Sequence, residues 1–189
     1  MKNVRLFNCV VFVTYFAVLN GSDCKHEESN EFIVWKEGRK IEWSDFQGKD
    51  FVGLRVLASS SIGIKLDYKV ADPVEWFNVE CVFFRTKSTT KKDNSPYILE
   101  HEQGHFDIGE IFARKLRKHI LSIKGMVNSH NYSMLDSIQH LYLNLLSDEQ
   151  DRYDKETEHS NDTVQQRLWV LRIRNTLDSF KAYSRHKYH

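Results

Sequence analysis

The sequence lacks an excess of charge of either sign. Its 189 residues include 27 lysines and arginines against 26 aspartates and glutamates. A protein that binds nucleic acid, or an acidic membrane surface, concentrates basic residues in a patch or along a helix. The balanced charge therefore argues against both as partners.

Cysteine is also scarce, with only three residues, Cys9, Cys24 and Cys81. Cys9 lies in a segment that we expect to be removed. Cys24 and Cys81 could form a disulfide in an oxidising compartment, or Cys81 could be a buried small hydrophobe between Val79 and Phe83; we favour the second. A closed structural zinc site usually includes cysteine, which only Cys24 or Cys81 could supply.

The sequence has no internal repeat and no low-complexity tract. The single long apolar run, Leu6 to Leu19, follows the basic residues Lys2 and Arg5 and precedes the small residues Asn20-Gly21-Ser22. It is shorter than a membrane-spanning helix needs, so it predicts a signal peptide over residues 1–22. We expect export to the periplasm or the medium, with no transmembrane segment after processing.

Residues 23–189 are then expected to form one domain, since 41% hydrophobic and 13% aromatic residues suffice for one compact core. Cys24 stands where a lipid-modified cysteine would be found. Asp23 before it matches poorly the small residue expected there, so we favour export without a lipid anchor. The oligomeric state cannot be inferred from the sequence.

The residues that carry chemistry are His101-Glu102-Gln103-Gly104-His105, an H-E-x-x-H motif. On an α-helix, residues four apart lie one above the other on the same face, so both imidazoles can bind one zinc ion. Glu102 lies one step round the helix, close enough to accept a proton from a water molecule activated by the metal. We expect His101 and His105 as ligands and Glu102 as the general base.

A helix is predicted from about Pro96 to Lys124. Ser95 can cap its start, Pro96 suits the first helical position, and Gly125 is expected as a left-handed stop. The two histidines continue an apolar stripe at helical spacing, so they should face the interior. The stripe consists of Ile108, Phe112, Leu116 and Ile123.

The fold class expected is α+β, with a small antiparallel sheet of about three to five strands over residues 31–90 and a helical half over 96–183. Strands are predicted at 32–35, 56–70 and 76–84, where β-branched and aromatic residues are frequent. A polar loop is expected over 86–94. In the helical half, Leu135, Ile138, Tyr142 and Leu145 should pack against another element, and residues 181–189 should be frayed.

A catalytic zinc site needs three protein ligands and an open position. Asp107 and Glu110 point away from His101 on a helix, so the third ligand must come from elsewhere. We prefer His159 to His119, His130 and His140, which lie at an expected helix end, in a loop and on a polar helix face. On spacing alone, His159 would be a solvated histidine.

Three segments in order resemble a family of predicted secreted bacterial zinc-dependent proteases, the domain of unknown function 922. They are Trp43 to Gly48, Leu99 to Ile108, and Tyr153-Asp154 through Thr157-Glu158-His159 with Gln165 or Gln166 and Trp169. The resemblance implies His101, His105 and His159 as ligands of one zinc ion and Glu102 as the general base. The sequence departs from the family at Ser160, where glycine is expected.

The function expected is a secreted zinc metallopeptidase of the H-E-x-x-H type, acting on peptide or protein substrates. Tyr153 could stabilise an oxyanion or simply pack at a helix end. Two alternatives stay open. One is a non-catalytic exported protein with a structural metal or none, in which Glu102 would have no purpose. The other is a zinc hydrolase that cleaves a cell-wall amide.

Overall fold

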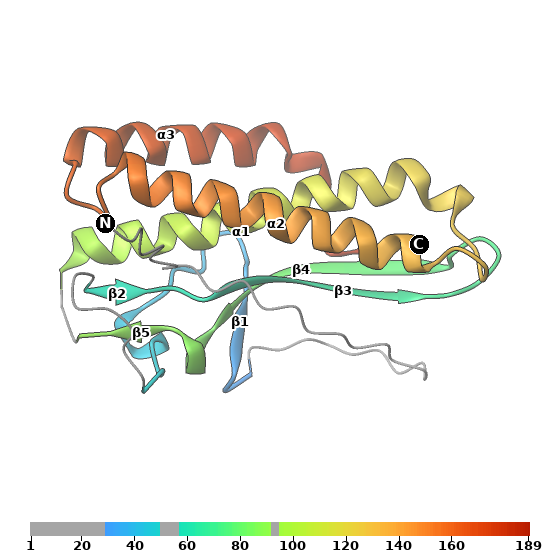
Figure 1. The fold of residues 1–189 in the computed structure, drawn as a ribbon, viewed down its shortest axis with the longest axis horizontal. Coiled ribbons are helices and arrows are strands. Elements are labelled where there is room, and N and C mark those ends of the chain that lie inside the picture. Colours follow the sequence, from blue (N-terminus) through green and yellow to red (C-terminus); the bar gives the residue numbers. More distant parts are fainter. Residues whose placement is uncertain (1–28, 50–56, 92–94) are drawn as a thin grey trace, which may run out of the picture.

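A computed structural model of the chain describes residues 29–49, 57–91 and 95–189. The predicted leader, Cys9 and Cys24 lie outside these residues. Small antiparallel sheets form one layer and three helices form the other (Figure 1). The α+β fold class is therefore confirmed. Within the described residues, no helix is both long and apolar enough to cross a membrane.

The main sheet is built around β4 (Trp76–Phe84), the longest strand. β3 (Ile62–Lys69) pairs with it along one edge, while β1 (Phe32–Val34) and the short β6 (Lys187–Tyr188) pair with different parts of it, all antiparallel. In β3 Ile62, Ile64 and Leu66 are buried, whereas Lys65 and Asp67 between them are partly exposed, as expected when alternate side chains face opposite sides of a sheet.

A second, two-stranded sheet joins β2 (Ala58–Ser59) to β5 (Thr89–Thr90). β5 lies inside the stretch 86–94, which was expected to be a polar loop. The motif Trp43 to Gly48 packs against it as a 3-10 helix, η1 (Trp43–Asp45), followed by residues 46–48 without regular secondary structure. Gly48 donates its N–H to the carbonyl of Ser88, and a Cβ at Gly48 would lie 2.8 Å from that oxygen. This early motif therefore has a packing role.

The helices are α1 (Pro96–Ile123), α2 (Ser133–Glu156) and α3 (Thr163–Ser179). Ser95 caps α1 by accepting the N–H of Ile98, as predicted, and Asp162 caps α3 by accepting from Val164 and Gln165. The start of α1, the end of α2 and the start of α3 meet at one end of the helical layer, above β2 and β5 (Figure 1).

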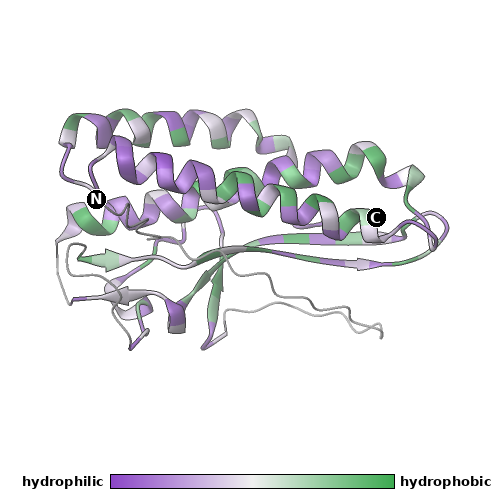
Figure 2. Cartoon of the chain, viewed as in Figure 1, coloured by the Kyte–Doolittle hydropathy of each residue, from purple (hydrophilic) through white to green (hydrophobic). Residues whose placement is uncertain are grey.

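The core lies between the sheet and α1. The predicted stripe of α1 is buried at Ile108, Phe112 and Leu116, and Ile123 is partly buried. A smaller cluster, Phe32, Val34, Val82 and Phe84, lies apart from it on β1 and β4. Along α2 the colours change from mixed to mostly hydrophilic toward the end that meets α1 and α3 (Figure 2).

Residues 181–189 are not frayed, which corrects the prediction. They form the 3-10 helix η4 (Lys181–Tyr183) and β6, and Phe77 of β4 pairs with Tyr188. The buried Arg117 explains the anchoring, because its guanidinium donates to the carbonyls of Val79 and Tyr183 at 2.8 and 3.0 Å. Such long-range contacts leave no local pattern in the sequence.

Two smaller predictions were also wrong. α1 ends at Ile123 and continues as the 3-10 helix η3 (Lys124–Met126), so Gly125 is not a left-handed stop. Leu145 is 43% exposed, whereas its neighbours Leu143 and Leu146 are buried. Leu135 is buried and Ile138 and Tyr142 pack partly buried against the core, as predicted, so only Leu145 departs from the expected stripe.

Candidate metal centre

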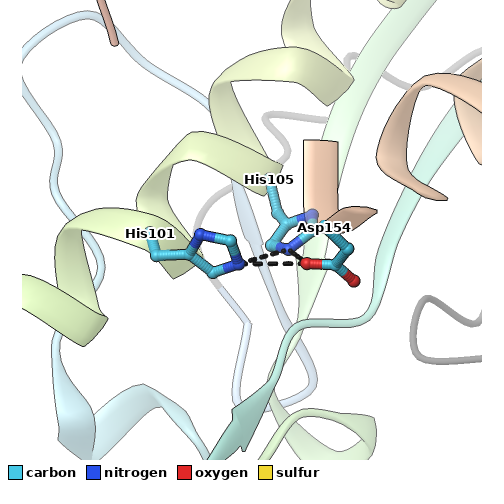
Figure 3. A group of neighbouring side chains, drawn as sticks. All are labelled: His101, His105 and Asp154. Carbon is cyan, nitrogen blue, oxygen red and sulfur yellow. Dashed lines mark hydrogen bonds and ion pairs between the residues drawn. The ribbon is translucent and has the colours of Figure 1, made fainter. Parts of the chain in front are cut away.

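Three side chains from two helices converge at the end of the helical layer described above. His101 and His105 come from the second and third turns of α1, and Asp154 comes from the last turn of α2 (Figure 3). All three are buried. The sequence analysis named both histidines, but not Asp154, as metal ligands.

The three facing atoms form a nearly equilateral triangle. Nε2 of His101 and Nε2 of His105 are 3.2 Å apart, and each lies 3.0 Å from Oδ1 of Asp154. Zinc bonds of about 2.0–2.1 Å at near-tetrahedral angles place neighbouring ligand atoms roughly 3.0–3.4 Å apart. The triangle has the size of one face of a zinc coordination shell.

Buried glutamines set the tautomer of each histidine. Nδ1 of His101 donates to Oε1 of Gln166 at 2.9 Å, and Nδ1 of His105 donates to Oε1 of Gln150. The amide nitrogen of Gln150 donates to the carbonyl of His105, and that of Gln166 donates to the Tyr153 hydroxyl, so both amides can turn only their oxygens toward the rings. With the proton on Nδ1, each Nε2 presents a lone pair to the triangle.

The electrostatics of the site also favour a cation. Burial alone would lower the pKa of His105, but the charge and hydrogen bond of Asp154, with smaller contributions from Glu102 and Gln150, raise it to about 9. Burial would raise the pKa of Asp154, yet His105 and the hydrogen bonds from the histidines hold it well below its usual range. A positive charge in the triangle is therefore stabilised.

Glu102 lies beside the triangle, as the motif predicts. Its Oε2 accepts a hydrogen bond of 2.5 Å from the hydroxyl of Ser60, which directly follows β2. Ser61 is held in turn by its N–H, which donates to the hydroxyl of Ser88 at 2.9 Å. The strand layer therefore fixes the orientation of Glu102, and Ser60 is a residue of the site that the sequence analysis missed.

Tyr153 supports the histidines from behind. Its fully buried ring stacks on His101 at 4.5 Å between centroids, and its hydroxyl donates to the carbonyl of His101. Gly104 makes this packing possible, because a Cβ there would lie 2.8 Å from Cζ of Tyr153. Of the two roles open to Tyr153, the contacts favour packing. Trp169 borders the same ring at 5.2 Å.

His159 lies next to the triangle but does not complete it. Its Nδ1 is 3.5 Å from Oδ1 of Asp154, and its side chain is 47% exposed. It does not belong to the group of side chains whose ligand atoms all lie within 4.8 Å of one another, which is His101, His105 and Asp154. That His159 binds the metal stays a prediction.

The other candidates lie away from the triangle. Asp107 accepts from Nε1 of Trp35 and from Gln103, and Glu110 binds Arg114 and Arg117. These contacts agree with the helical geometry that argued against both as ligands. Cys81 is a free, fully buried thiol that contacts the carbonyl of Phe106.

A pocket of about 210 Å³ opens onto the triangle. The triangle and Glu102 line it together with residues from three segments, 57–60, 95–98 and 159–161. A buried group of ligand atoms with an accessible open side can take a metal ion and a small part of a substrate together.

Comparisons of the chain with protein-family models, curated proteins and solved structures gave no match. The chemistry of the site therefore has to be argued from its own residues. The sequence contained only a weak signal for Asp154, its helical spacing from Leu143 and Leu146. Gln150, Tyr153 and Asp154 continue the buried stripe of α2, and polar residues within a buried stripe are uncommon without a partner.

Proposed function

We propose that the protein is a zinc-dependent metallohydrolase, most simply a peptidase, with one zinc ion held by His101, His105 and Asp154. The observation that carries this proposal is the triangle itself. Its three atoms face one another at 3.0–3.2 Å, and with neutral histidines all three present lone pairs to one point. A cation is needed to make this arrangement favourable when buried.

The supporting residues fit a metal site as well. Histidine ligands of metals usually donate their other ring N–H to an oxygen that fixes the ring. Gln166 and Gln150 fill that place here, both nearly inaccessible to solvent. Two histidines and a carboxylate occur both in catalytic zinc sites and in non-haem Fe(II) sites. Glu102 between the two histidines, in an H-E-x-x-H motif, favours zinc.

When bound, zinc would supply Lewis acidity, which makes a water molecule acidic and polarises a carbonyl group. The chain supplies the rest. Glu102 has the position of a general base, and Ser60 holds its carboxylate by the hydrogen bond to Oε2. Glu102 would take the proton of the attacking water and give it to the leaving nitrogen as the C–N bond breaks.

The main alternative is a non-catalytic exported protein with a structural metal or none. A purely structural site has no use for a carboxylate like Glu102 beside the ligands, or for a pocket that opens onto them. A hydrolase that cleaves a cell-wall amide would use the same site. Export itself, and the resemblance to the predicted secreted zinc proteases, stay part of the proposal.

The test is zinc content of the purified protein measured together with hydrolysis of casein and of cell-wall muropeptides. Glu102→Gln should keep one zinc per chain and lose at least about a hundredfold in rate, because only the base is removed. Asp154→Ala should lose zinc. His130→Ala changes an exposed histidine outside the pocket and is the matched control.

The possible outcomes distinguish a hydrolase from a non-catalytic protein and identify the third ligand. A wild-type protein without zinc would move the assignment to the non-catalytic reading. Zinc with no hydrolysis of either substrate, and no effect of Glu102→Gln, would favour a structural metal. Loss of zinc in His159→Ala but not in Asp154→Ala would make His159 the third ligand, as the sequence analysis predicted.

A further inference from the structure

The turn between α2 and α3 has an uncommon backbone. Glu158, His159 and Ser160 all have positive φ angles, of 49°, 51° and 70°. A left-handed conformation costs a non-glycine residue roughly 1–2 kcal/mol, and runs of three are unusual. Such conformations persist only where the surrounding contacts enforce them, and they are frequent at functional sites.

Part of the turn is an ordinary helix cap. His159 N–H donates to the carbonyl of Asp154 at 2.8 Å, and Glu158 N–H donates to that of Lys155 at 3.4 Å. This is the Schellman pattern, which needs one left-handed residue, here Glu158. The cap explains why residues five apart, Asp154 and His159, lie together. It does not explain why His159 and Ser160 are left-handed too.

Further contacts hold the rest of the turn. Asp162 N–H donates to the carbonyl of Thr157 at 2.9 Å, and the side-chain amide of Asn161 donates to that of Glu158 at 2.7 Å. The hydroxyl of the buried Thr157 donates to the carbonyl of Tyr153 at 2.7 Å, which ties the turn to the residue behind His101. The strained conformation is therefore firmly enforced next to the triangle.

The turn places the imidazole of His159 in the wall of the pocket that the triangle and Glu102 also line. Nδ1 faces Asp154, and Nε2 has no hydrogen-bond partner among the described residues. Ligands of one zinc ion lie at most about 4 Å apart, twice a bond length. Because His159 is outside the group within 4.8 Å, its ring in this arrangement would stand beside an ion held by the triangle rather than bind it.

We propose that the left-handed turn 158–160 presents His159 to the substrate, as the group that hydrogen-bonds the reacting oxygen. This inference rests on the proposed hydrolase function. As the water oxygen bonds to the carbonyl carbon, the electron pair of the C=O double bond moves onto the carbonyl oxygen. The Nε2–H of His159, whose Nδ1–H faces Asp154, donates to that oxygen, while Glu102 holds the proton of the water.

The experiment uses zinc-loaded protein and, as a probe, a phosphinic dipeptide, whose tetrahedral phosphorus mimics the hydrated carbonyl. Zinc content, the visible spectrum of the cobalt-substituted protein, and the dissociation constant of the probe by calorimetry are measured. His159→Ala should keep one zinc and the wild-type cobalt spectrum, but weaken probe binding about 10- to 100-fold. His159→Gln should recover part of the loss, because its amide can donate.

Two variants of Ser160 test the turn itself. Ser160→Gly accepts the left-handed conformation without strain and should bind the probe like wild type. Ser160→Val, whose β-branched side chain disfavours positive φ, should keep zinc and weaken the probe about as much as His159→Ala. Wild-type probe affinity in Ser160→Val would overturn the role of the turn.

The remaining outcomes are distinct. Loss of zinc or a changed cobalt spectrum in His159→Ala would overturn the inference and make His159 a ligand. Unchanged probe binding with zinc retained would also overturn it, while leaving the hydrolase proposal in place. If zinc-loaded wild type neither binds the probe nor hydrolyses casein or muropeptides, the proposed function fails, and this inference fails with it.

Discussion

Helix α1 contributes to two buried polar clusters. Comparing them distinguishes a candidate metal site from a cluster that only stabilises the fold. One cluster contains Glu110, Arg114 and Arg117. Oε1 of Glu110 accepts from Arg114 at 2.9 Å and from Arg117 at 2.7 Å, and both arginines reach backbone carbonyls elsewhere in the fold. Every charge in this cluster has a partner of opposite sign or a hydrogen bond.

The other cluster, His101, His105 and Asp154, can present three acceptors to its centre. Gln150 and Gln166 accept the outer N–H groups of the histidines, so the inner atoms of neutral rings are lone pairs that a proton or a metal ion must neutralise. A buried cluster that balances its own charge stabilises the fold without help. One whose inner atoms can all act as acceptors is a candidate for binding a metal ion.

The largest expected effect comes from removing a corner of the triangle. Asp154→Ala should weaken zinc binding by about a thousandfold or more, since even residues behind the ligands are worth 10- to 100-fold. Competition with a chromophoric chelator measures this. Arg117→Met should leave zinc affinity per folded molecule within about threefold of wild type, and a larger change would couple the two clusters.

Arg117→Met should instead reduce stability. It leaves Glu110 buried with one cationic partner fewer and frees the carbonyls of Val79 and Tyr183, so a loss of about 3–5 kcal/mol is expected. Urea unfolding measures it. Arg152→Met, which removes an exposed arginine paired with Glu156, should cost less than about 1 kcal/mol. Equal losses in both variants would contradict the distinction.

The clusters should also differ in pH dependence when metal is absent. The pKa of His105 rises from 6.5 to about 9 on folding. Its charged form therefore stabilises the metal-free fold fully below pH 6.5, and this stabilisation, on the order of 3 kcal/mol, is lost as the pH rises through 9. Between about pH 6 and 9.5 the unfolding temperature should fall without zinc but not with zinc, because the metal replaces the proton. The same pH dependence of the unfolding temperature with and without zinc would contradict the assignment of His105 as a ligand.

A smaller loss of stability is expected at Gly104, which packs against Tyr153 behind the triangle. Gly104→Ala places a methyl group against Tyr153 and should cost about 1–3 kcal/mol, because the stacked ring must move. Gly125→Ala is the matched control, since nothing lies within 4 Å of a Cβ there. Urea unfolding of the two variants compares them, and no difference would mean that Tyr153 is free to shift.

The sequence predicted the helix of the site well, because its signals are local. Ser95 and Pro96 mark the start of α1, and the stripe places His101 and His105 inside. Asp154 was missed because the stretch around it looked uniformly polar, and its burial depends on packing against α1. The strands β5 and β6 were missed for a similar reason, since each has two residues and is defined by its partner.

The contrast between local sequence signals and contacts made by the fold also applies to Ser160. The departure from glycine placed the turn after His159 in doubt, and the structure gives Ser160 a φ of 70°, a conformation that glycine would adopt more easily. A residue type alone indicates which conformation is easy. It does not indicate which one surrounding hydrogen bonds enforce.

The pairing of Lys187–Tyr188 with β4 has a consequence for biosynthesis. Translation must proceed through Tyr188 before the edge of β4 at Phe77 and Asn78 acquires its partner. Until then a growing chain exposes unpaired backbone groups on its central strand, and such an edge can pair with a strand of another molecule. This short part of β4 therefore stays open to other strands until β6 has been made, and we expect a bulky tag fused beside β6 to weaken the pairing.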